Sequence, residues 1–267
     1  MVGDSCIRML SGVFPQERSR LILDRDDPVG TAPVLILTST VRPHPGVTVR
    51  VNDEQIRLGQ YRHALRWWKS NSPWPIVFVD NSGSPLFEEL NPEMNARCLL
   101  MAVEPPPAHL AARGKGVCEA LMLRGAIERL DQRFNVIVKV TGRLTVTNID
   151  KCLPPFDGRF VTCKMTPDLT FSDSRIFAGD RQSVNYLADC IIDKSNDEDV
   201  RYFEHELAAG ALHLFSQGVA FRSFRRLPSI RGISGTSGQS YGRGWQVPAR
   251  LTYDGVRRFV HWRNLSL

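Results

Sequence analysis

Two cations and a glycine follow an apolar run in the segment VIVKVTGRLTVTN. Lys139 and Arg143 stand four residues apart, on either side of Thr141 and Gly142. If the apolar run is a strand, both cations project from its end toward a crevice, together with Lys115 at the start of an expected helix. Such cations suit a diphosphate, since charge-assisted hydrogen bonds to phosphate are stronger than exposed ion pairs. The alternative is that Lys139 extends to solvent at the sheet edge and that Arg143 pairs with a surface acid.

A carboxylate stands beside an apolar helix stripe in the segment YFEHELAAGALHLF. At roughly 100° per residue, Glu204 falls at the edge of this stripe, whereas His205 and Glu206 point further from it. A carboxylate near a crevice and beside apolar side chains can have a raised pKa and serve as a general base, with His205 as a second candidate. The alternative is a glutamate that reaches solvent or pairs with an arginine. The apolar stripe consists of Val200, Phe203, Leu207, Ala211 and Leu214.

Two further groups of polar residues suit an acceptor or a loop. Asp173 and Arg175 stand at the mouth of an expected strand, where they would bind acceptor hydroxyls or hold a loop by a local ion pair. Arg231, Ser234 and Gly235 belong to the basic, glycine-rich tail SIRGISGTSGQSYGRGW. We expect a mobile loop there, because glycine and small polar residues favour irregular backbone.

Alternating strands and helices must position these residues. The first expected strand covers 34–37 and leads to Thr38, Ser39 and, further on, Arg42. A helix follows, with Asn52 as its expected N-cap. The apolar positions of this helix are Ile56, Tyr61, Leu65 and Trp68.

The second expected strand, 76–79, ends in a polar turn that begins with Asp80 and Asn81. Another helix, 114–134, and another strand, 135–143, repeat the unit. Such units form parallel sheets whose ligand crevice lies at the carboxyl ends of the strands. The polar residues after these strands therefore belong to one edge of the sheet.

Beyond residue 150 the pattern is weaker, with strands expected over 159–165 and 174–179 and a helix over 197–218. The expected fold class is α/β, with a mostly parallel central sheet flanked by helices and a smaller C-terminal region. We expect a leader at 1–32 and one domain at 33–267, with halves at 33–150 and 151–267 and the glycine-rich loop at 229–244.

Composition narrows the class of protein. A chain of 267 residues with 42% hydrophobic content can bury the core of a single domain. The net charge of +6 favours anionic ligands without choosing among them. Six cysteines without a C-x-x-C pair are typical of reduced thiols in a cytosolic protein. We expect a soluble, cytoplasmic protein, since no run reaches the ~20 apolar residues of a membrane span.

The tail VRRFVHWRNLSL interleaves arginines with aromatic residues. It suits an ordinary amphipathic element or a peripheral contact with the inner face of the plasma membrane. Other signals are missing from the chain: the phosphate loop, the dinucleotide fingerprint, the G-x-S-x-G elbow and the H-E-x-x-H helix. The chain therefore lacks the central motifs of kinases, dehydrogenases, serine hydrolases and zinc peptidases.

Eight blocks in order over about 34–240 resemble those of bacterial glycosyltransferases that assemble polysaccharide and lipopolysaccharide, such as O-antigen or capsule. The blocks are LTSTVRP, RLGQYRHAL, IVFVDNSG, GKGVCEA, KVTGRL, FSDSRIF, FEHELA and SIRGISGTSG. The resemblance implies a GT-A-like, Rossmann-like sheet, a nucleotide-sugar donor and a glycan or lipid-linked acceptor. It also implies site roles: Thr38, Ser39 and Arg42 at the nucleotide, Asp80 and Asn81 at the base or ribose, and Lys115 at the diphosphate.

Many enzymes of this kind hold a divalent metal, Mn or Mg, with an Asp-x-Asp pair where KVTGR stands here. Because this pair is missing, we hypothesise that Lys139 and Arg143, helped by Lys115 or Arg231, offset the charge of the departing diphosphate. The expected mechanism is inverting displacement, with Glu204 taking the proton of the acceptor hydroxyl.

Two other classes remain open. Arginines interleaved with aromatics in FRSFRRLPSIRG suggest a nucleic-acid-binding protein, but no RRM, KH or helix-turn-helix signature accompanies them. We therefore expect no nucleic-acid partner. The third class is a catalytically silent α/β module of a polysaccharide assembly complex.

Overall fold

The computed structural model describes residues 32–45, 49–234 and 238–242. The expected leader lies outside these residues except for Ala32, and Gly235 and the tail after 242 lie outside them too. The elements in chain order are β1 (Ala32–Ser39), α1 (Glu54–Asn71), β2 (Ile76–Asp80), the 3-10 helix η1 (Pro85–Glu93), β3 (Cys98–Ala102), α2 (Ala108–Ala111), α3 (Lys115–Arg129), β4 (Phe134–Thr141), β5 (Leu144–Val146), α4 (Ile149–Cys152), β6 (Phe160–Thr162), β7 (Ile176–Asp180), α5 (Arg181–Lys194), α6 (Phe203–Ser216), β8 (Ala220–Phe221), β9 (Ile230–Ile233) and β10 (Ser240–Tyr241).

A seven-stranded sheet forms the centre of the fold, with the strand order β3-β2-β1-β4-β7-β6-β8. β1 pairs in parallel with β2 and β4, and β2 pairs in parallel with β3. β7 runs antiparallel between β4 and β6, and β8 is parallel to β6. The expected α/β class with a mostly parallel sheet is thus confirmed. Strands from early and late parts of the chain pair directly where β4 meets β7.

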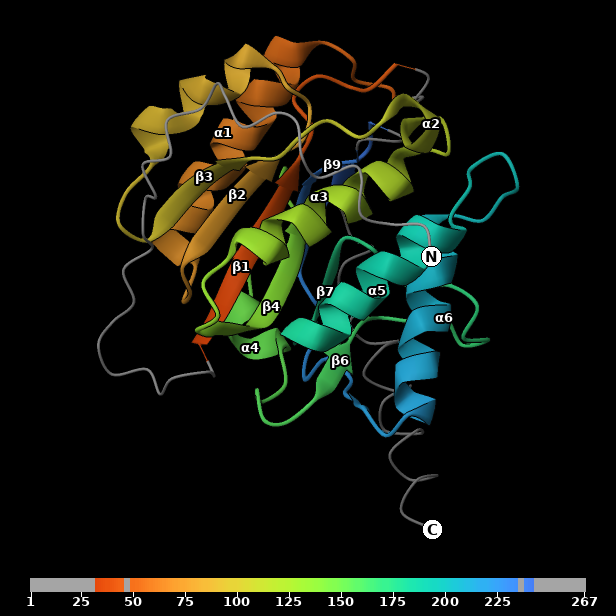
Figure 1. The fold of residues 1–267 in the computed structure, drawn as a ribbon. Helices are drawn as coiled ribbons and strands as arrows, with labels where there is room; N and C mark the ends of the chain where they lie inside the picture. The colour runs from red at the N-terminus through yellow and green to blue at the C-terminus, as the bar shows by residue number, and fades with distance from the viewer. Residues whose placement is uncertain (1–31, 46–48, 235–237, 243–267) are drawn as a thin grey trace.

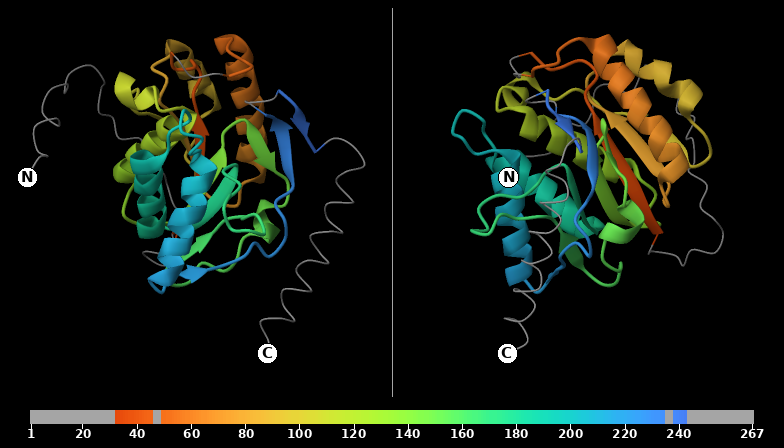
Figure 2. Two further views of the ribbon diagram at one scale, coloured as in Figure 1. Left: turned by 90° about the vertical axis from the view of Figure 1, so that its right-hand side faces the viewer. Right: turned by 180° about the vertical axis from the view of Figure 1, so that it is seen from behind.

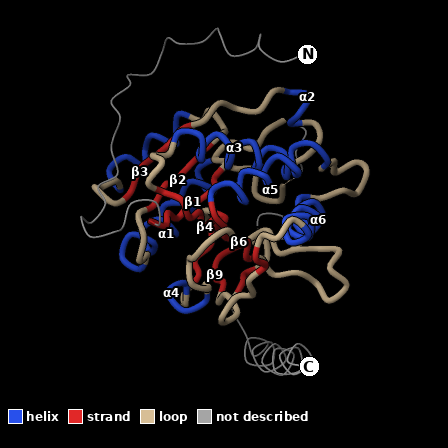
Figure 3. Tube along the Cα trace, turned by 60° about the horizontal axis from the view of Figure 1, so that its bottom comes forward, coloured by secondary structure: helices blue, strands red, loops and turns tan. Residues whose placement is uncertain are grey.

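Helices cover both faces of this sheet (Figure 1). α3, α5 and α6 pack side by side on one face, and α1 with η1 covers the other (Figures 1 and 2). The tube view shows the same arrangement, with blue helices on both sides of the red strands (Figure 3). Each face buries its own apolar cluster, because successive side chains of a strand point to opposite faces. Ile36 and Ile137 belong to the first cluster, and Leu35 and Val138 belong to the second.

A second, three-stranded antiparallel sheet has the order β10-β9-β5. Its strands β9 and β10 lie inside the segment for which a loop was expected throughout, so that expectation is wrong for Ile230–Ile233 and Ser240–Tyr241. β9 is a strand because its backbone bonds to β5, whose Leu144 carbonyl also accepts a hydrogen bond from the indole of Trp68 (2.8 Å). Gly232, at a φ of 128°, approaches the Arg143 carbonyl where a Cβ would clash.

The first helix begins one residue later than expected. Its N-cap is Asp53, not Asn52, and the Asp53 carboxylate accepts a hydrogen bond from the backbone N–H of Ile56 (2.8 Å). The capping places Ile56 in solvent, 56% exposed, whereas Tyr61 and Trp68 are buried as expected. The expected strands 34–37 and 76–79 are confirmed as β1 and β2. The helix expected over 114–134 is α3, which already ends at Arg129, and the strand expected over 135–143 is β4, which begins at Phe134 and ends at Thr141.

The sixth helix is shorter than the expected 197–218, because the preceding loop closes on itself. Asn196 and Arg201 form an antiparallel bridge, and Val200 adopts a φ of 57° at the loop tip. Val200 is 59% exposed and therefore does not belong to the apolar stripe of α6. Glu206 was expected to point away from the core, but it is buried in an ion pair with Arg201 (2.6 Å).

Sequence reasoning missed η1, β3, β5 and α5. α5 begins directly after β7, where Asp180 caps it by accepting a hydrogen bond from the backbone N–H of Ser183 (3.1 Å). The guanidinium of Arg181, at the first helical position, donates to the carbonyls of Ile127 and Leu130 at the end of α3. α5 is thus joined to α3 by a buried cation as well as by apolar packing.

Two features reduce the number of free backbone groups at the edges of the large sheet. β8 is only two residues long at one edge. At the other edge, the terminal carbonyl of β3, that of Ala102, accepts a hydrogen bond from Nη1 of Arg129 (2.6 Å). Membrane-spanning candidates are absent among the helices of the described residues.

The ends of β1 and β4 approach each other closely at Gly142. Its backbone N–H donates to the Thr38 carbonyl (2.8 Å), and a Cβ at this position would lie 2.7 Å from the same oxygen. The glycine after β4 is therefore required by this contact and not by an unusual φ. The contact sets the distance between the two strand ends that carry the polar residues.

We predict that Gly142→Ala lowers the free energy of unfolding by roughly 1–3 kcal/mol, because the added methyl group forces the two strand ends apart. Gly59→Ala is the matched control, since Gly59 is exposed in α1 and a Cβ there meets nothing within 4 Å. The control should stabilise the protein by about 0.5–1 kcal/mol through helix propensity. Chemical denaturation of both variants measures the difference; equal stabilities would contradict the close approach.

Candidate functional site

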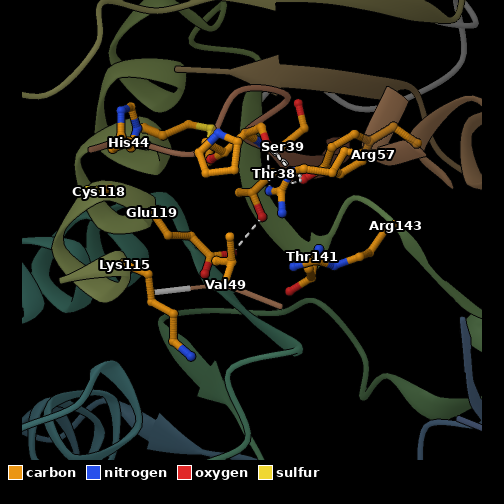
Figure 4. Close-up of a pocket in the computed structure, with 14 residues that line it drawn as sticks. Thr38, Ser39, His44, Val49, Arg57, Lys115, Cys118, Glu119, Thr141 and Arg143 are labelled. Carbon is orange, nitrogen blue, oxygen red and sulfur yellow. Dashed lines mark hydrogen bonds between the residues drawn. The ribbon is translucent and has the colours of Figure 1, made fainter. Parts of the chain in front are cut away.

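A pocket lies at the carboxyl ends of β1 and β4, against the N-terminal turns of α3 (Figure 4). This edge of a parallel sheet is where α/β proteins bind ligands, because loops diverge there and helix N-termini point toward it. The cavity volume is about 90 Å³. Its lining residues are Thr38, Ser39, Thr40, Pro43, His44, Val49, Arg57, Tyr61, Lys115, Cys118, Glu119, Met122, Thr141 and Arg143.

Arg143 brings an unsatisfied cation to the pocket. Its Nη1 is shielded from solvent and has no hydrogen-bond partner among the residues that the structure describes. A buried donor without a partner is costly, and more so when it carries charge, so such groups call for an explanation. The alternative that Arg143 pairs with a surface acid is not what the structure shows, since none of its nitrogens has a carboxylate partner within ion-pair distance among the described residues. The geometry suits an arginine that receives its acceptor from a ligand.

Lys139 lies elsewhere than expected. Its side chain is fully buried on the face of β4 that packs against α3 and α6, with its ammonium over the rings of Phe177 and Phe203, 5.5 Å from each centroid. Its Nζ lies 2.7 Å from Oε1 of Glu119 and donates to the Ser174 carbonyl (2.7 Å). Lys139 therefore neither projects into the crevice nor extends to solvent at the sheet edge. Its charge is neutralised by Glu119.

Glu119 is the pocket residue that sequence reasoning missed. It is 26% exposed on α3, and its Oε1 also accepts a hydrogen bond from the hydroxyl of Thr38 on β1 (2.7 Å), shown as a dashed line in Figure 4. Burial works against its ionisation, but the Lys139 ammonium and the Thr38 hydroxyl outweigh it and hold the pKa of Glu119 below its ordinary value of 4.5. Glu119 is consequently an anion at neutral pH.

Of the two other expected cations, Lys115 lies at the pocket and Arg42 does not. Lys115, in the first turn of α3, lines the pocket. Arg42 is half exposed and forms an ion pair with Glu54 of α1 (2.7 Å). Arg42 is not among the lining residues. Of the cations expected at the crevice or at the nucleotide, the structure brings together Arg143 and Lys115.

Asp80 and Asn81 organise the loops behind the pocket. The Asp80 carboxylate accepts hydrogen bonds from the hydroxyl of Ser39, the backbone of Val41 and both donors of Ser82, although burial raises its pKa. The Asn81 amide donates to the Cys118 carbonyl (2.8 Å). Both side chains are buried and neither lines the pocket. They hold the strand ends in place and leave no carboxylate oxygen for a ribose.

A buried arginine supports the loop on the opposite wall. The Arg57 guanidinium donates to the carbonyls of Thr40 and Val51 and to the hydroxyl of Tyr61. His44 lies beside them, within 3.3 Å of the Asn81 amide oxygen, and burial lowers its pKa. These residues belong to α1 and to the loop after β1. No sequence motif indicated that either segment lines the pocket.

Glu204 lies at the start of α6, outside the pocket lining. Its Oε1 accepts a hydrogen bond from the hydroxyl of Ser174 (2.6 Å), the residue whose carbonyl receives Lys139. Glu204 is partly exposed, and no ion pair joins it to an arginine of the described residues. Nδ1 of His205 accepts the backbone N–H of Tyr202 (3.1 Å) and so completes the N-terminal cap of α6. This hydrogen bond occupies the lone pair of Nδ1.

Asp173 and Arg175 form the local ion pair that was one of their two expected roles. Arg175 donates through Nε and Nη2 to the two oxygens of Asp173 (2.8 and 2.5 Å), and its guanidinium stacks over the ring of Tyr241 (4.7 Å). The pair thereby ties β10 to the loop before β7. Arg231 is exposed on β9, opposite Thr145 of β5, and the Ser234 backbone bonds to the turn that leads to β10. None of these four lines the pocket.

The described residues contain no group of three or more His, Cys, Asp or Glu side chains that could hold a metal. Where the resemblance places an acidic pair, β4 ends at Thr141 and leads to the arginine of the pocket. The residues present do not fit a divalent metal held by such a pair. No chemical step is therefore assigned to a metal.

No protein-family model and no curated protein matches the chain. Solved structures align with much of the chain at low sequence identity. A Desulfovibrio desulfuricans protein described as a "putative nucleotide-diphospho-sugar transferase" aligns over 72% of this chain and 78% of its own, with 11% identity and a TM-score of 0.43. HddC from Yersinia pseudotuberculosis aligns over 77% and 95%, with 10% identity and a TM-score of 0.44. Mouse xyloside xylosyltransferase 1 aligns over 72% and 84%, with 11% identity and a TM-score of 0.36. At these scores the likeness concerns layout alone, and function has to be argued from the pocket.

We predict that Lys139→Met lowers the free energy of unfolding by roughly 3–5 kcal/mol, because it leaves the Glu119 carboxylate without its buried partner. Combining it with Glu119→Gln should recover at least half of the loss, since the second change removes the uncompensated charge. Chemical denaturation of the two single variants and the double variant measures the coupling. Additive losses would show that the two side chains do not depend on each other.

Proposed function

We propose that this protein is a glycosyltransferase that binds a nucleotide sugar in the pocket and transfers the sugar to a glycan or lipid-linked glycan acceptor in cell-surface polysaccharide synthesis. The observation that carries the proposal is the shielded, unpartnered Nη1 of Arg143 at the carboxyl edge of β1 and β4. A diphosphate supplies the acceptor oxygens that this nitrogen lacks, and an arginine binds phosphate in a fixed, planar geometry.

The pocket suits the diphosphate end of such a donor. Lys115 adds a second cation from the first turn of α3, where backbone N–H groups also favour an anion. Lys139 adds no net charge, because Glu119 neutralises it. The cations that line the pocket are Arg143, Lys115 and Arg57, and Lys139 is not one of them. This set replaces the earlier hypothesis that Lys139 and Arg143 act together.

In the proposed reaction, the acceptor hydroxyl attacks the anomeric carbon of the donor sugar as Glu204 takes its proton. A new carbon–oxygen bond forms, the bond from the anomeric carbon to the phosphate oxygen breaks, and the nucleoside diphosphate departs with the bonding electrons. Arg143 and Lys115 offset the charge that develops on this leaving group. Ser174 orients the Glu204 carboxylate by its hydrogen bond. The displacement inverts the anomeric configuration.

We predict that Arg143→Gln weakens the binding of a nucleoside diphosphate about 10- to 100-fold, as expected for the loss of a charged hydrogen bond. UDP, GDP, CDP and dTDP serve as probes in thermal shift and titration calorimetry, because a ligand of the native state raises apparent stability. The melting temperature of the free variant should equal or exceed that of the wild type, since Nη1 of Arg143 has no partner to lose.

Arg226→Gln is the matched control, because Arg226 is exposed and does not line the pocket. It should leave the binding of all four diphosphates unchanged. Failure of every diphosphate to shift the wild-type melting temperature would contradict the proposed function. Such a result, together with salt-sensitive RNA binding, would favour a nucleic-acid-binding protein.

We predict that Glu204→Gln abolishes sugar transfer, or slow hydrolysis of the nucleotide sugar, while the diphosphate still binds. Removal of a general base costs about 10²- to 10⁴-fold in turnover. The assay is run on the wild type with and without EDTA, and activity should persist with the chelator. Normal turnover of the Gln variant would remove Glu204 from the role, and a chelator-sensitive activity restored by manganese would replace the metal-free mechanism.

A further inference from the structure

We propose that Glu119 recognises the ribose hydroxyls of the donor, so that the pocket selects ribonucleoside diphosphates over their deoxy counterparts. This inference rests on the proposed function, because it names which nucleotide the same pocket accepts. The expected ribose ligands, Asp80 and Asn81, are buried away from the pocket, whereas Glu119 lines it.

One oxygen of Glu119 is available to a ligand. Both of its side-chain contacts, to Lys139 Nζ and to the Thr38 hydroxyl, use Oε1 at 2.7 Å. Oε2 accepts no hydrogen bond from any residue that the structure describes. An ionised carboxylate accepts hydrogen bonds only, so Oε2 can accept one from a ligand hydroxyl. Figure 4 shows Glu119 extending from α3 toward Thr38 inside the group of pocket residues.

An unpaired carboxylate would repel a diphosphate, but the Glu119 carboxylate is paired with the ammonium of Lys139 on the core side. The Lys139 ammonium lies in the core, between Phe177 and Phe203, and cancels the charge of Glu119 without occupying the pocket. Glu119 can therefore accept hydroxyls a short distance from an anion held by Arg143. The same pairing keeps Glu119 ionised, because the ammonium lowers its pKa against the effect of burial.

The placement of the two groups limits the ligand. Arg143 follows β4 and Glu119 belongs to α3, and both face the same cavity of about 90 Å³. A ligand that satisfies both has to carry phosphate oxygens and hydroxyl donors close together. The ribose and phosphate of a ribonucleotide do so. A 2′-deoxyribose offers one hydroxyl fewer and leaves the carboxylate less well satisfied.

The test compares nucleotides on the wild-type protein by titration calorimetry. UDP, GDP and CDP are each measured against their 2′-deoxy and 3′-deoxy analogues, with dTDP as an additional probe. We expect a loss of about tenfold for at least one deoxy analogue of the nucleotide that binds best, because a site built to bond a hydroxyl rejects a ligand without it. dTDP should bind more weakly than UDP.

A variant assigns the discrimination to Glu119. Glu119→Gln should reduce the difference between the ribonucleotide and its deoxy analogue to less than about threefold. Lys139→Met with Glu119→Gln provides the same test without an unpaired buried cation, in case the single variant is unstable. Glu128→Gln on the exposed part of α3 is the matched control and should keep the wild-type difference.

Deoxy analogues that bind within about threefold of UDP to the wild type, or dTDP as the tightest ligand, would overturn the inference while the proposed function stands. Discrimination that persists in both Glu119 variants would overturn it as well. If no diphosphate binds at all, the proposed function fails and the inference fails with it.

Discussion

The ion pair between Lys139 and Glu119 joins β4 to α3, and two further elements surround it. Lys139 comes from the middle of the sheet, Glu119 from α3, and the rings that enclose the ammonium come from β7 and α6. A fully buried ammonium is tolerated only when its charge is paired and its protons are bonded, and here a carboxylate and the Ser174 carbonyl meet that requirement. This contact helps to fix the position of α3 relative to β4, and α3 forms one wall of the pocket.

Much of the fold was predictable because parallel strands that are buried on both faces appear as continuous apolar runs. β1, β2 and β4 all show this pattern, and the helices between them carry ordinary amphipathic spacing. α5 escaped notice because it follows β7 without a loop and opens with an arginine whose burial depends on carbonyls of α3. The start of α6 was misjudged because acidic residues suit a first helical turn, whereas a bridge between Asn196 and Arg201 closes that segment into a loop.

The candidate site was predictable in location but not in the division of roles. Thr38, Ser39, Lys115, Thr141 and Arg143 all line the pocket, as their places after strands or at a helix start imply. Because side chains of β4 alternate between the two faces of the sheet, Lys139 lies on the same face as Ile137, which packs against α3, α5 and α6. This alternation could have been predicted from the sequence. The partner of Lys139 could not, because no local pattern tells which glutamate of a distant helix will meet a buried lysine.

The edges of the large sheet have a consequence for how the protein behaves at high concentration. Unpaired strands at a sheet edge can add strands from another molecule, and this is a common route to aggregation. The two-residue strand β8 offers few free backbone groups at one edge, and Arg129 occupies the last carbonyl of β3 at the other. In a concentrated solution, both features reduce the number of backbone groups that could pair with a strand of another molecule.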